Sequence, residues 1–261
     1  MSQDPNQLTF LEHLDELRTR LIRAIACVLI TGIAAFVFKE ELFEIYKKPL
    51  LPLLEKDPDL LVVLSPIEPF LVYIKISVVT GIFIGLPFLL RELWAFLVPA
   101  LSRDEKRASL PFLLAGTTCF MAGVLFCYFL VLPAALTVLH DLLPPTVNAS
   151  YSMALFFNFI TAMLLAFGLA FDLPVLMVLL AKLGILHPAW LARYRRYVVV
   201  GLFILAAMVT PPDPFTQVAM ALPLWLLFEI GLVVSRLVIA ASPVPEAESE
   251  TPEAGASPES G

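Results

Sequence analysis

Two acidic side chains stand inside long apolar segments, where an ionisable group is costly and therefore a functional candidate. Asp172 occurs in Ala-Phe-Asp-Leu-Pro, with Pro174 two residues later, and Glu229 occurs in Phe-Glu-Ile. Such carboxylates can carry coupled ions in a transporter or contact a polar group of another membrane helix. A structural explanation stays open for both, because each can lie near the membrane surface, hydrated or paired with an arginine of a loop.

The densest polar motif is Thr-Pro-Pro-Asp-Pro at residues 210–214, between two short apolar runs. Its prolines end one helix, and Asp213 followed by Pro214 is a typical helix start, so Asp213 needs no role beyond capping. Thr210 and Gln217 differ, because they place hydrogen-bonding side chains just inside short apolar helices. Groups of this kind can hold a membrane helix of a partner protein.

Two acidic clusters lie outside the apolar segments. Asp15 and Glu16 form the first cluster, and Asp104 and Glu105 form the second, each with arginines nearby. The usual explanation is a solvated surface whose charges pair among themselves. The functional alternative is a pocket for a cationic peptide, because a carboxylate can bind a guanidinium with two hydrogen bonds.

The composition places these groups in a membrane protein. Of 261 residues, 59% are hydrophobic and 15% are charged, against about 45–50% and about 25% in soluble domains. The mean hydropathy is +0.88. The net charge of −6 argues against a nucleic-acid partner, and five Glu within residues 246–261 account for most of it. The three cysteines stand in apolar runs and are expected to be packing residues.

The apolar runs predict an all-α integral membrane protein with six transmembrane helices. We expect these helices at about residues 21–38, 70–97, 108–133, 153–180, 195–211 and 214–236. Prolines within or at the ends of the spans (Pro87, Pro133, Pro174 and Pro223) should kink or shorten helices and give a bent scaffold. Gly81 and Gly85, four residues apart, are expected to allow close helix packing inside the molecule.

The basic residues predict that both termini are cytoplasmic. Twelve of the 17 Lys and Arg flank the first span on its N-terminal side, occupy the second and fourth loops, or follow the last span. Residues 1–20 lack the pattern of a signal peptide and are expected to form an amphipathic helix at the membrane surface that runs into the first span. A second amphipathic helix is expected in the first outer loop. Residues 237–261 are expected to be a disordered acidic cytoplasmic tail.

Several classes of chemistry have no pattern in the sequence. There is no P-loop, no H-E-x-x-H and no arrangement of cofactor ligands. The three histidines lie outside the spans or at their edges, so no buried histidine can activate a serine. We therefore expect neither an enzyme nor a bound metal or cofactor.

Five segments, in this order and spacing, together resemble TatC, the multispanning receptor subunit of the twin-arginine protein translocase. They are residues 10–21, 94–101 with 104–107, 166–174, 210–217 and 227–231, which read FLEHLDELRTRL, WAFLVPAL with DEKR, AFGLAFDLP, TPPDPFTQ and LFEIG. The resemblance implies a concave bundle like a cupped hand in the cytoplasmic (inner) membrane. It also implies binding of twin-arginine signal peptides of folded cargo proteins. TatA- and TatB-like single-span subunits, further copies of the receptor and membrane lipid are the other implied partners.

The resemblance also implies roles for particular residues. By motif position, Glu16 and Glu105 would bind the paired arginines of the signal peptide, supported by Arg18, Phe96 and Arg107. Two further assignments concern the first outer loop and the partner helix. Pro49 matches a functionally sensitive proline, and Thr210 and Gln217 match the polar patch where single-span subunits dock.

One position departs from the family pattern, which usually has Glu where this chain has Asp172. Asp keeps the charge but reaches one methylene less far. The resemblance implies a non-enzymatic translocase receptor that uses the proton motive force, which is consistent with the absence of a nucleotide-binding motif. The alternative is an ion-coupled secondary transporter that uses Asp172 and Glu229, although a carrier needs no carboxylate clusters on its cytoplasmic face.

Overall fold

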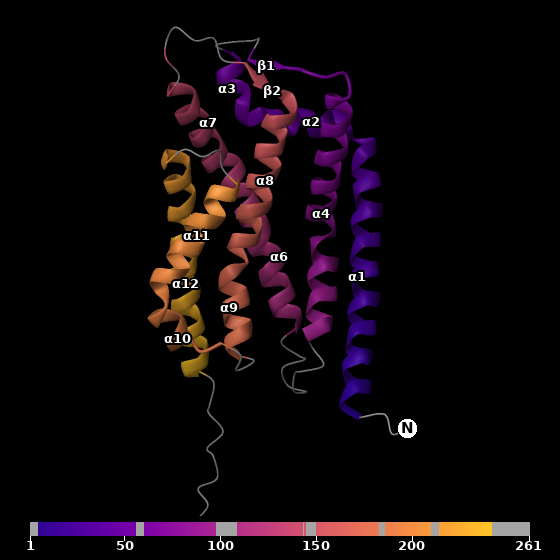
Figure 1. The fold of residues 1–261 in the computed structure, drawn as a ribbon, viewed down its shortest axis with the longest axis vertical. Helices are drawn as coiled ribbons and strands as arrows, with labels where there is room; N and C mark the ends of the chain where they lie inside the picture. Colours follow the sequence, from indigo (N-terminus) through magenta and orange to yellow (C-terminus); the bar gives the residue numbers. More distant parts are fainter. Residues whose placement is uncertain are drawn as a thin grey trace, which may run out of the picture.

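The computed structural model describes residues 5–55, 60–97, 109–142, 144, 150–182, 186–209 and 214–241. Long helices run roughly side by side, and α1 begins at the same end of the bundle at which α12 ends (Figure 1). The α-helices are α1 (Pro5–Val37), α2 (Lys39–Lys47), α3 (Leu51–Leu54), α4 (Glu68–Leu97), α6 (Ser109–Phe126), α7 (Leu132–Asp141), α8 (Met153–Phe171), α9 (Leu173–Lys182), α10 (Pro188–Arg193), α11 (Arg195–Val209) and α12 (Pro214–Ala241). A 3₁₀ turn η1 (Lys48–Leu50), a π-helical turn η3 (Cys127–Val131) and the strands β1 (Leu61–Val62) and β2 (Tyr151–Ser152) complete the described elements.

Five helical segments of the described chain are long and apolar enough to cross a membrane. They are Leu14–Val37, Glu68–Phe96, Leu110–Asp141, Met153–Lys182 and Met220–Val238. These segments correspond to five of the six predicted spans. The remaining predicted span, at residues 195–211, falls on α11, which has only 15 residues, whereas about 20 are needed to cross a hydrocarbon core of about 30 Å. The six-span topology therefore stays a prediction.

The first span and the segment before it form one helix. α1 continues through residue 20, where the sequence analysis placed the boundary between the surface helix and the first span. The side chains of Ile30 and Ile33 are each 69% exposed, as expected for a helix that faces lipid along much of its length. Where the membrane surface crosses α1 stays a prediction.

Glycines bring α1 and α4 into backbone contact. A Cβ atom added at Gly81 of α4 would lie 2.6 Å from the backbone nitrogen of Gly32 in α1, closer than packing allows. Oγ1 of Thr31 lies 2.8 Å from the carbonyl oxygen of Gly81, so a hydrogen bond accompanies the approach. Gly85, one turn later, faces Cys27 and Thr31. The expectation that Gly81 and Gly85 serve internal packing is confirmed.

The prolines act differently in different helices. Pro87 and Pro223 lie inside α4 and α12, which continue past them. Pro133 is the second residue of α7, one residue after the π-helical turn η3, and because proline has no N–H, the preceding turn cannot keep regular α-helical hydrogen bonds. Pro174 follows the junction of α8 and α9 in the same way. Two of the four prolines therefore mark the breaks that the sequence predicted.

A carboxylate ties together the ends of α4 and α8 at one end of the bundle. Glu68, the first residue of α4, is 5% exposed. Its oxygens accept hydrogen bonds from the backbone N–H groups of Leu64 (2.7 Å) and Ala154 (2.5 Å) and from the hydroxyl of Ser152 (2.7 Å). The adjoining strands β1 and β2 pair in parallel, with Leu61 opposite Tyr151. We call this arrangement the Glu68 clamp.

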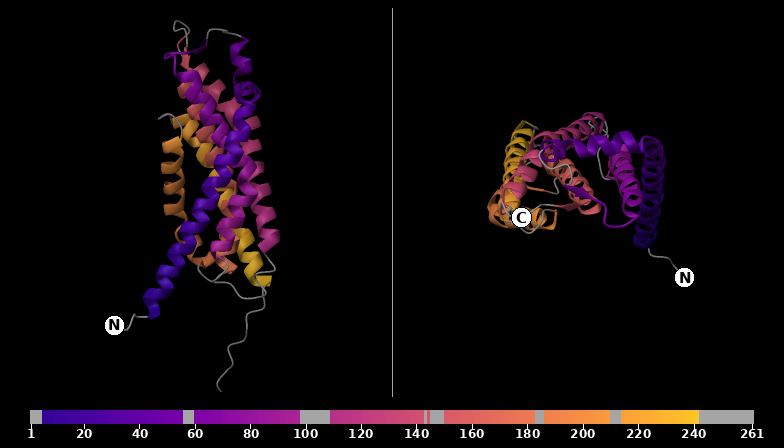
Figure 2. Two further views of the ribbon diagram at one scale, coloured as in Figure 1. Left: turned by 90° about the vertical axis from the view of Figure 1, so that its right-hand side faces the viewer. Right: turned by 90° about the horizontal axis from the view of Figure 1, so that it is seen from above.

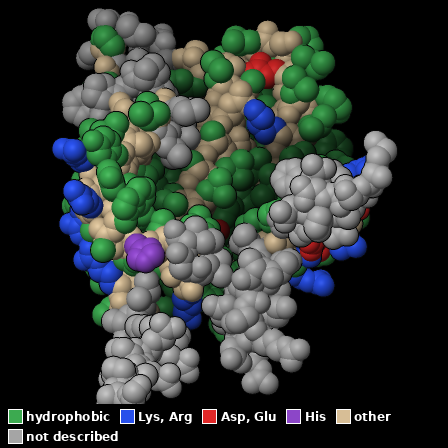
Figure 3. Space-filling model, turned by 60° about the horizontal axis from the view of Figure 1, so that its bottom comes forward, with side chains coloured by type: hydrophobic (Ala, Val, Ile, Leu, Met, Phe, Trp, Pro, Cys, Tyr) green, Lys and Arg blue, Asp and Glu red, His purple; other side chains and the backbone are tan. Residues whose placement is uncertain are grey.

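The helices do not form a solid cylinder. Seen along the bundle, the pair of α1 and α4 occupies one edge and the pair of α11 and α12 the other (Figure 2). A space-filling view shows a hollow in the middle of one face, lined mostly by hydrophobic side chains, whereas most Lys and Arg side chains lie at its periphery (Figure 3).

The predicted amphipathic helix of the first outer loop is confirmed as α2, whose Tyr46 is buried and whose Leu42 and Phe43 pack against the core.

Candidate functional site

An ion-pair network joins α1 to α4 near the N-terminal end of α1. The guanidinium of Arg20 contacts Glu16, one turn earlier on α1, with 2.5 Å between Nη2 and Oε1. It also contacts Glu92 of α4, with 3.4 Å between Nη1 and Oε2. The exposed fraction of the side chain falls from 34% for Glu16 to 20% for Arg20 and 9% for Glu92. One arginine therefore links a half-buried carboxylate to a buried one.

A small cavity lies beside this network. Its volume is about 180 Å³, and its walls come from α1 and α4: Leu17, Arg20, Leu21, Ala24, Leu89, Glu92, Leu93 and Phe96. Phe96 and Glu92 are four residues apart, so they share a face of α4. The surroundings are an aromatic ring, aliphatic side chains and a charged pair, which suit the stem and head of an arginine or lysine side chain.

The structure describes three of the five residues predicted to bind the signal peptide. Glu16 lies in the ion-pair network, Phe96 lines the adjoining cavity, and Arg18 is exposed. Glu105 and Arg107 lie outside the described residues. The sequence analysis missed Glu92, although its spacing of four residues from Phe96 could have pointed to it.

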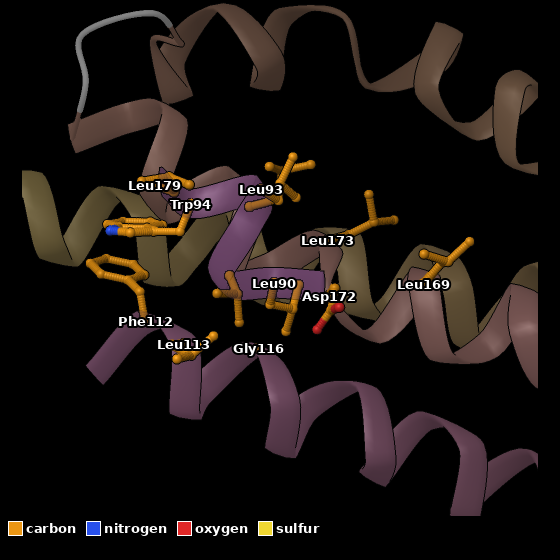
Figure 4. Close-up of a pocket in the computed structure, with 12 residues that line it drawn as sticks. Leu90, Leu93, Trp94, Phe112, Leu113, Gly116, Leu169, Asp172, Leu173 and Leu179 are labelled. Carbon is orange, nitrogen blue, oxygen red and sulfur yellow. The ribbon is translucent and has the colours of Figure 1, made fainter. Parts of the chain in front are cut away.

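Asp172 lies at the junction of α8 and α9, where it is the C-terminal cap of α8. Its Oδ1 atom is buried and has no hydrogen-bond partner among the described residues. It faces a cavity of about 220 Å³ between α4, α6 and α9 (Figure 4). Trp94 lines the same cavity, stacks on Phe112 with 5.4 Å between ring centroids, and has a buried Nε1 that also has no partner in the described part of the chain. The cavity thus offers one unused acceptor and one unused donor.

Glu229 has a different environment. Its Oε2 lies 3.2 Å from Nη2 of Arg195, the first residue of α11. The side chains of Arg195 and Glu229 are 47% and 24% exposed. The sequence left Glu229 either a functional role or a structural explanation, in which it pairs with an arginine. The structure shows such a pair, with an arginine that flanks an apolar segment.

The predicted partner patch is only partly described. Nε2 of Gln217 in α12 donates a hydrogen bond of 3.1 Å to the carbonyl oxygen of Phe203 in α11. Thr210 lies outside the described residues. Gln217 therefore already bridges α11 and α12 within the molecule, while its side-chain carbonyl oxygen and second N–H are additional hydrogen-bonding groups.

Pro49 is buried in η1, directly after α2. The neighbouring Tyr46 forms a hydrogen bond of 3.1 Å with Oγ1 of Thr80 in α4. Burial raises the pKa of Tyr46 to about 12, although the hydrogen bond with Thr80 opposes the shift. Pro49 thus stands where α2 is fixed to the bundle.

Comparison with known proteins decides the family. Residues 12–223 match the family model described as "Sec-independent protein translocase protein (TatC)". The chain belongs to the TatC family. It is 42% identical over 229 residues to the Sec-independent protein translocase protein TatC of Aquifex aeolicus, covering 87% of this chain and 94% of that protein. The TatC protein of Escherichia coli is 34% identical over 227 residues, covering 87% and 88%.

A solved structure agrees with the family assignment. The crystal structure described as "Twin Arginine Translocase Receptor- TatC" superposes with a TM-score of 0.78 at 41% identity, and the match covers 87% of this chain and 99% of that chain. The predicted resemblance to TatC is therefore confirmed. Family membership and the five candidate spans make this chain a multi-pass membrane protein and a component of Sec-independent protein translocation.

Proposed function

We propose that this chain is the receptor subunit of a twin-arginine translocase in the cytoplasmic membrane. It binds the twin-arginine signal peptides of folded cargo proteins and then recruits TatA- and TatB-like single-span subunits. The observation that carries the proposal is the pairing of Glu16 and Glu92 with one guanidinium beside Phe96, because it places guanidinium-binding chemistry where the family motif lies. Both termini face the cytoplasm in this proposal, and the hollow of the bundle is the cupped face of the family.

Glu16 and Glu105 bind the two arginines of the signal peptide in this proposal, and Arg18, Phe96 and Arg107 support them. Each charge-assisted hydrogen bond between a carboxylate and a guanidinium contributes about 1.5–3 kcal/mol. The two carboxylates must converge on one surface, since a signal peptide presents its arginines on neighbouring residues. Glu16 lies near the start of α1, and Glu105 follows α4, whose C-terminal end lies at the same end of the bundle (Figure 1).

The test is the affinity of the detergent-purified receptor for a synthetic twin-arginine signal peptide. Glu16→Gln and Glu105→Gln keep the side-chain shape and remove the charge, so each should weaken binding by about tenfold or more. Glu44→Gln is the matched control, because Glu44 pairs with Lys47 on the exposed surface of α2. Unchanged affinity in both single variants and in the double variant would rule out this assignment.

We propose that Thr210 and Gln217 form the docking patch for a single-span partner. A polar side chain of the partner helix would bond to the groups of Gln217 that the contact with Phe203 does not use. Site-specific photocrosslinking from position 218, which is 49% exposed, should capture a TatA- or TatB-like subunit. Gln217→Leu should lower that yield severalfold and leave signal-peptide affinity unchanged.

The short helix beside this patch supports a proposal about the lipid. α11 is about 22 Å long, whereas α12 has 28 residues and its apolar segment continues past Glu229 to Val238, so the expectation that both helices are short is wrong for α12. We propose that α11 and α12 span the membrane as the fifth and sixth helices and that α11 thins the bilayer beside it. Inserting four apolar residues before Thr210 should then abolish transport and preserve peptide binding. Normal transport by that variant would exclude thinning.

Asp172 has a separate role in this proposal, since its cavity lies between α4, α6 and α9, whereas the ion-pair network lies between α1 and α4. The unpaired Oδ1 is an acceptor for a polar group of an inserted signal peptide or of a partner helix. Because the sequence contains no nucleotide-binding motif, the proton motive force that drives the family is the energy source consistent with this chain.

The alternative of an ion-coupled carrier needs Asp172 and Glu229 on one ion path. Glu229 is paired with Arg195 of α11, whereas Asp172 lines a cavity between α4, α6 and α9. The two carboxylates thus have different neighbours, which favours the receptor.

A further inference from the structure

Arg20 occupies a position that the proposed function reserves for another arginine. Two of its nitrogens, Nε at 3.1 Å and Nη2 at 2.5 Å, contact Oε1 of Glu16. Glu16 is one of the two carboxylates assigned to the signal peptide. The chain's own guanidinium therefore uses the acceptor that an incoming guanidinium would use.

Arg20 and a peptide arginine cannot both bind Glu16 as closely without repulsion. The two positive charges would lie within a few ångströms of each other, in a region that is largely shielded from water. Arg20 is only 20% exposed at its side chain, so solvent screens its charge less than that of a free surface arginine. Peptide binding thus requires Arg20 to move away from Glu16.

Glu92 can remain the partner of Arg20 after Arg20 leaves Glu16. Its side chain is 9% exposed, and a buried carboxylate is stable only while a cation or hydrogen-bond donors stay beside it. Nη1 of Arg20 already lies 3.4 Å from Oε2 of Glu92. The cavity that Arg20 and Glu92 both line provides room for the guanidinium to turn fully toward Glu92.

We propose that Arg20 is a resident competitor for Glu16, so that a signal peptide must displace Arg20 in order to bind and the affinity of the receptor for the peptide is lowered. The proposal rests on the proposed function, in which Glu16 binds a signal-peptide arginine. A peptide arginine displaces Arg20 because it replaces the lost contacts with two parallel hydrogen bonds. A lysine is a compact point charge that cannot form this bidentate pair, so it displaces Arg20 poorly.

The first experiment compares two signal peptides that differ only in their pair of arginines or lysines. Binding of each to the detergent-purified full chain is measured by fluorescence anisotropy. Arg20→Gln frees Glu16, so the affinity for each peptide should rise by about tenfold, because neither peptide then has to displace Arg20. Arg23→Gln, which removes an exposed positive charge three residues later on α1, should change either affinity by less than about threefold.

A second variant guards against misfolding. Arg20→Gln leaves the buried Glu92 without its cation, which can destabilise the packing of α1 on α4. The double variant Arg20→Gln with Glu92→Gln removes both charges and should reproduce the gain in affinity for both peptides in protein that elutes as a folded species. Glu92→Gln alone should weaken peptide binding, because Arg20 then has only Glu16 as a partner.

The outcomes separate this inference from the proposed function. If Glu16→Gln leaves twin-arginine binding unchanged, the proposed function fails, and the competitor role fails with it. If Glu16→Gln weakens binding but neither Arg20→Gln nor the double variant raises the affinity for either peptide, only the inference about Arg20 is overturned. Weaker binding of both peptides to Arg20→Gln and to the double variant would likewise overturn it, because the removal of a competitor should not lower the affinity for a peptide.

Discussion

Asp172 and Glu229 have the same signature in the sequence and opposite surroundings in the structure. Each is a lone carboxylate in an apolar stretch near the end of a predicted span. Glu229 is partly exposed and bound to Arg195, whereas Oδ1 of Asp172 is buried and without a partner among the described residues. The difference comes from elements distant in sequence: α11 brings an arginine to Glu229, and α4 and α6 bring apolar side chains to Asp172. The helices that pack around a carboxylate, and not its neighbours in the sequence, therefore decide whether it is paired.

The largest effect expected from this comparison is the loss of export in Asp172→Leu. Leucine keeps the branched shape of the side chain but has no oxygen atoms, so the cavity loses the carboxylate, and export of a twin-arginine reporter should fall by at least about tenfold. Glu229 is paired with Arg195 and does not line the Asp172 cavity, so Glu229→Leu should retain most of the export activity. Full export by Asp172→Leu would leave Asp172 without a role and remove the distinction.

The packing between the two carboxylates gives the next effect. A Cβ atom at Gly231 of α12 would lie 2.8 Å from Sδ of Met177 and 2.9 Å from Cα of Pro174 in α9. Gly231→Val should therefore push α12 from α9 and lower stability by about 1–3 kcal/mol. Gly201→Ala in α11 is the matched control, because nothing described lies within 4 Å of the added atom.

Thermal unfolding in detergent, followed by tryptophan fluorescence, checks the Gly231→Val prediction. The control Gly201→Ala should melt at the same temperature as the parent chain or slightly higher, since alanine favours a helix more than glycine does. An unchanged melting temperature for Gly231→Val would mean that α9 and α12 are less tightly packed than described.

Conservative changes at Asp172 should have smaller effects. Asp172→Asn keeps an acceptor oxygen and removes the charge, so export should fall by no more than about threefold if the carboxyl acts as a hydrogen-bonding group. Asp172→Glu restores the residue usual in the family and should retain activity. Loss of export in Asp172→Asn equal to that in Asp172→Leu would instead assign the function to the charge.

The smallest effect is expected at the ion pair. Exposed salt bridges contribute about 0–1 kcal/mol, and Arg195 is 47% exposed. A double-mutant cycle of Arg195→Gln and Glu229→Gln, measured by unfolding in detergent, should give a coupling energy below about 1 kcal/mol, with export retained. A coupling of several kcal/mol, or a loss of export in Glu229→Gln, would place Glu229 in the same class as Asp172.

The sequence predicted the membrane class and five of the described spans well, because hydrocarbon thickness imposes length and hydrophobicity on each helix separately. It could not predict the partners that packing supplies. Glu92 follows Arg91 near the end of an apolar run and reads as an ordinary boundary charge, whereas its contact, Arg20, lies 72 positions earlier. Helix continuity, by contrast, was expected, since the amphipathic N-terminal segment was predicted to run into the first span, and the two form one helix.

The Glu68 clamp has a consequence for the order in which the protein assembles. Ser152 and Ala154 follow Glu68 by 84 and 86 residues, so the carboxylate has no lasting partner from β2 or α8 until the ribosome has made residue 154. α1 and α4 can pack through Gly32 and Gly81 long before that point. During biosynthesis, α1 and α4 can therefore pack together before α8 is made, while the N-terminal end of α4 at Glu68 still lacks its contacts with β2 and α8. Insertion of α8 then locks that end, and the bundle acquires its final shape only in the second half of translation.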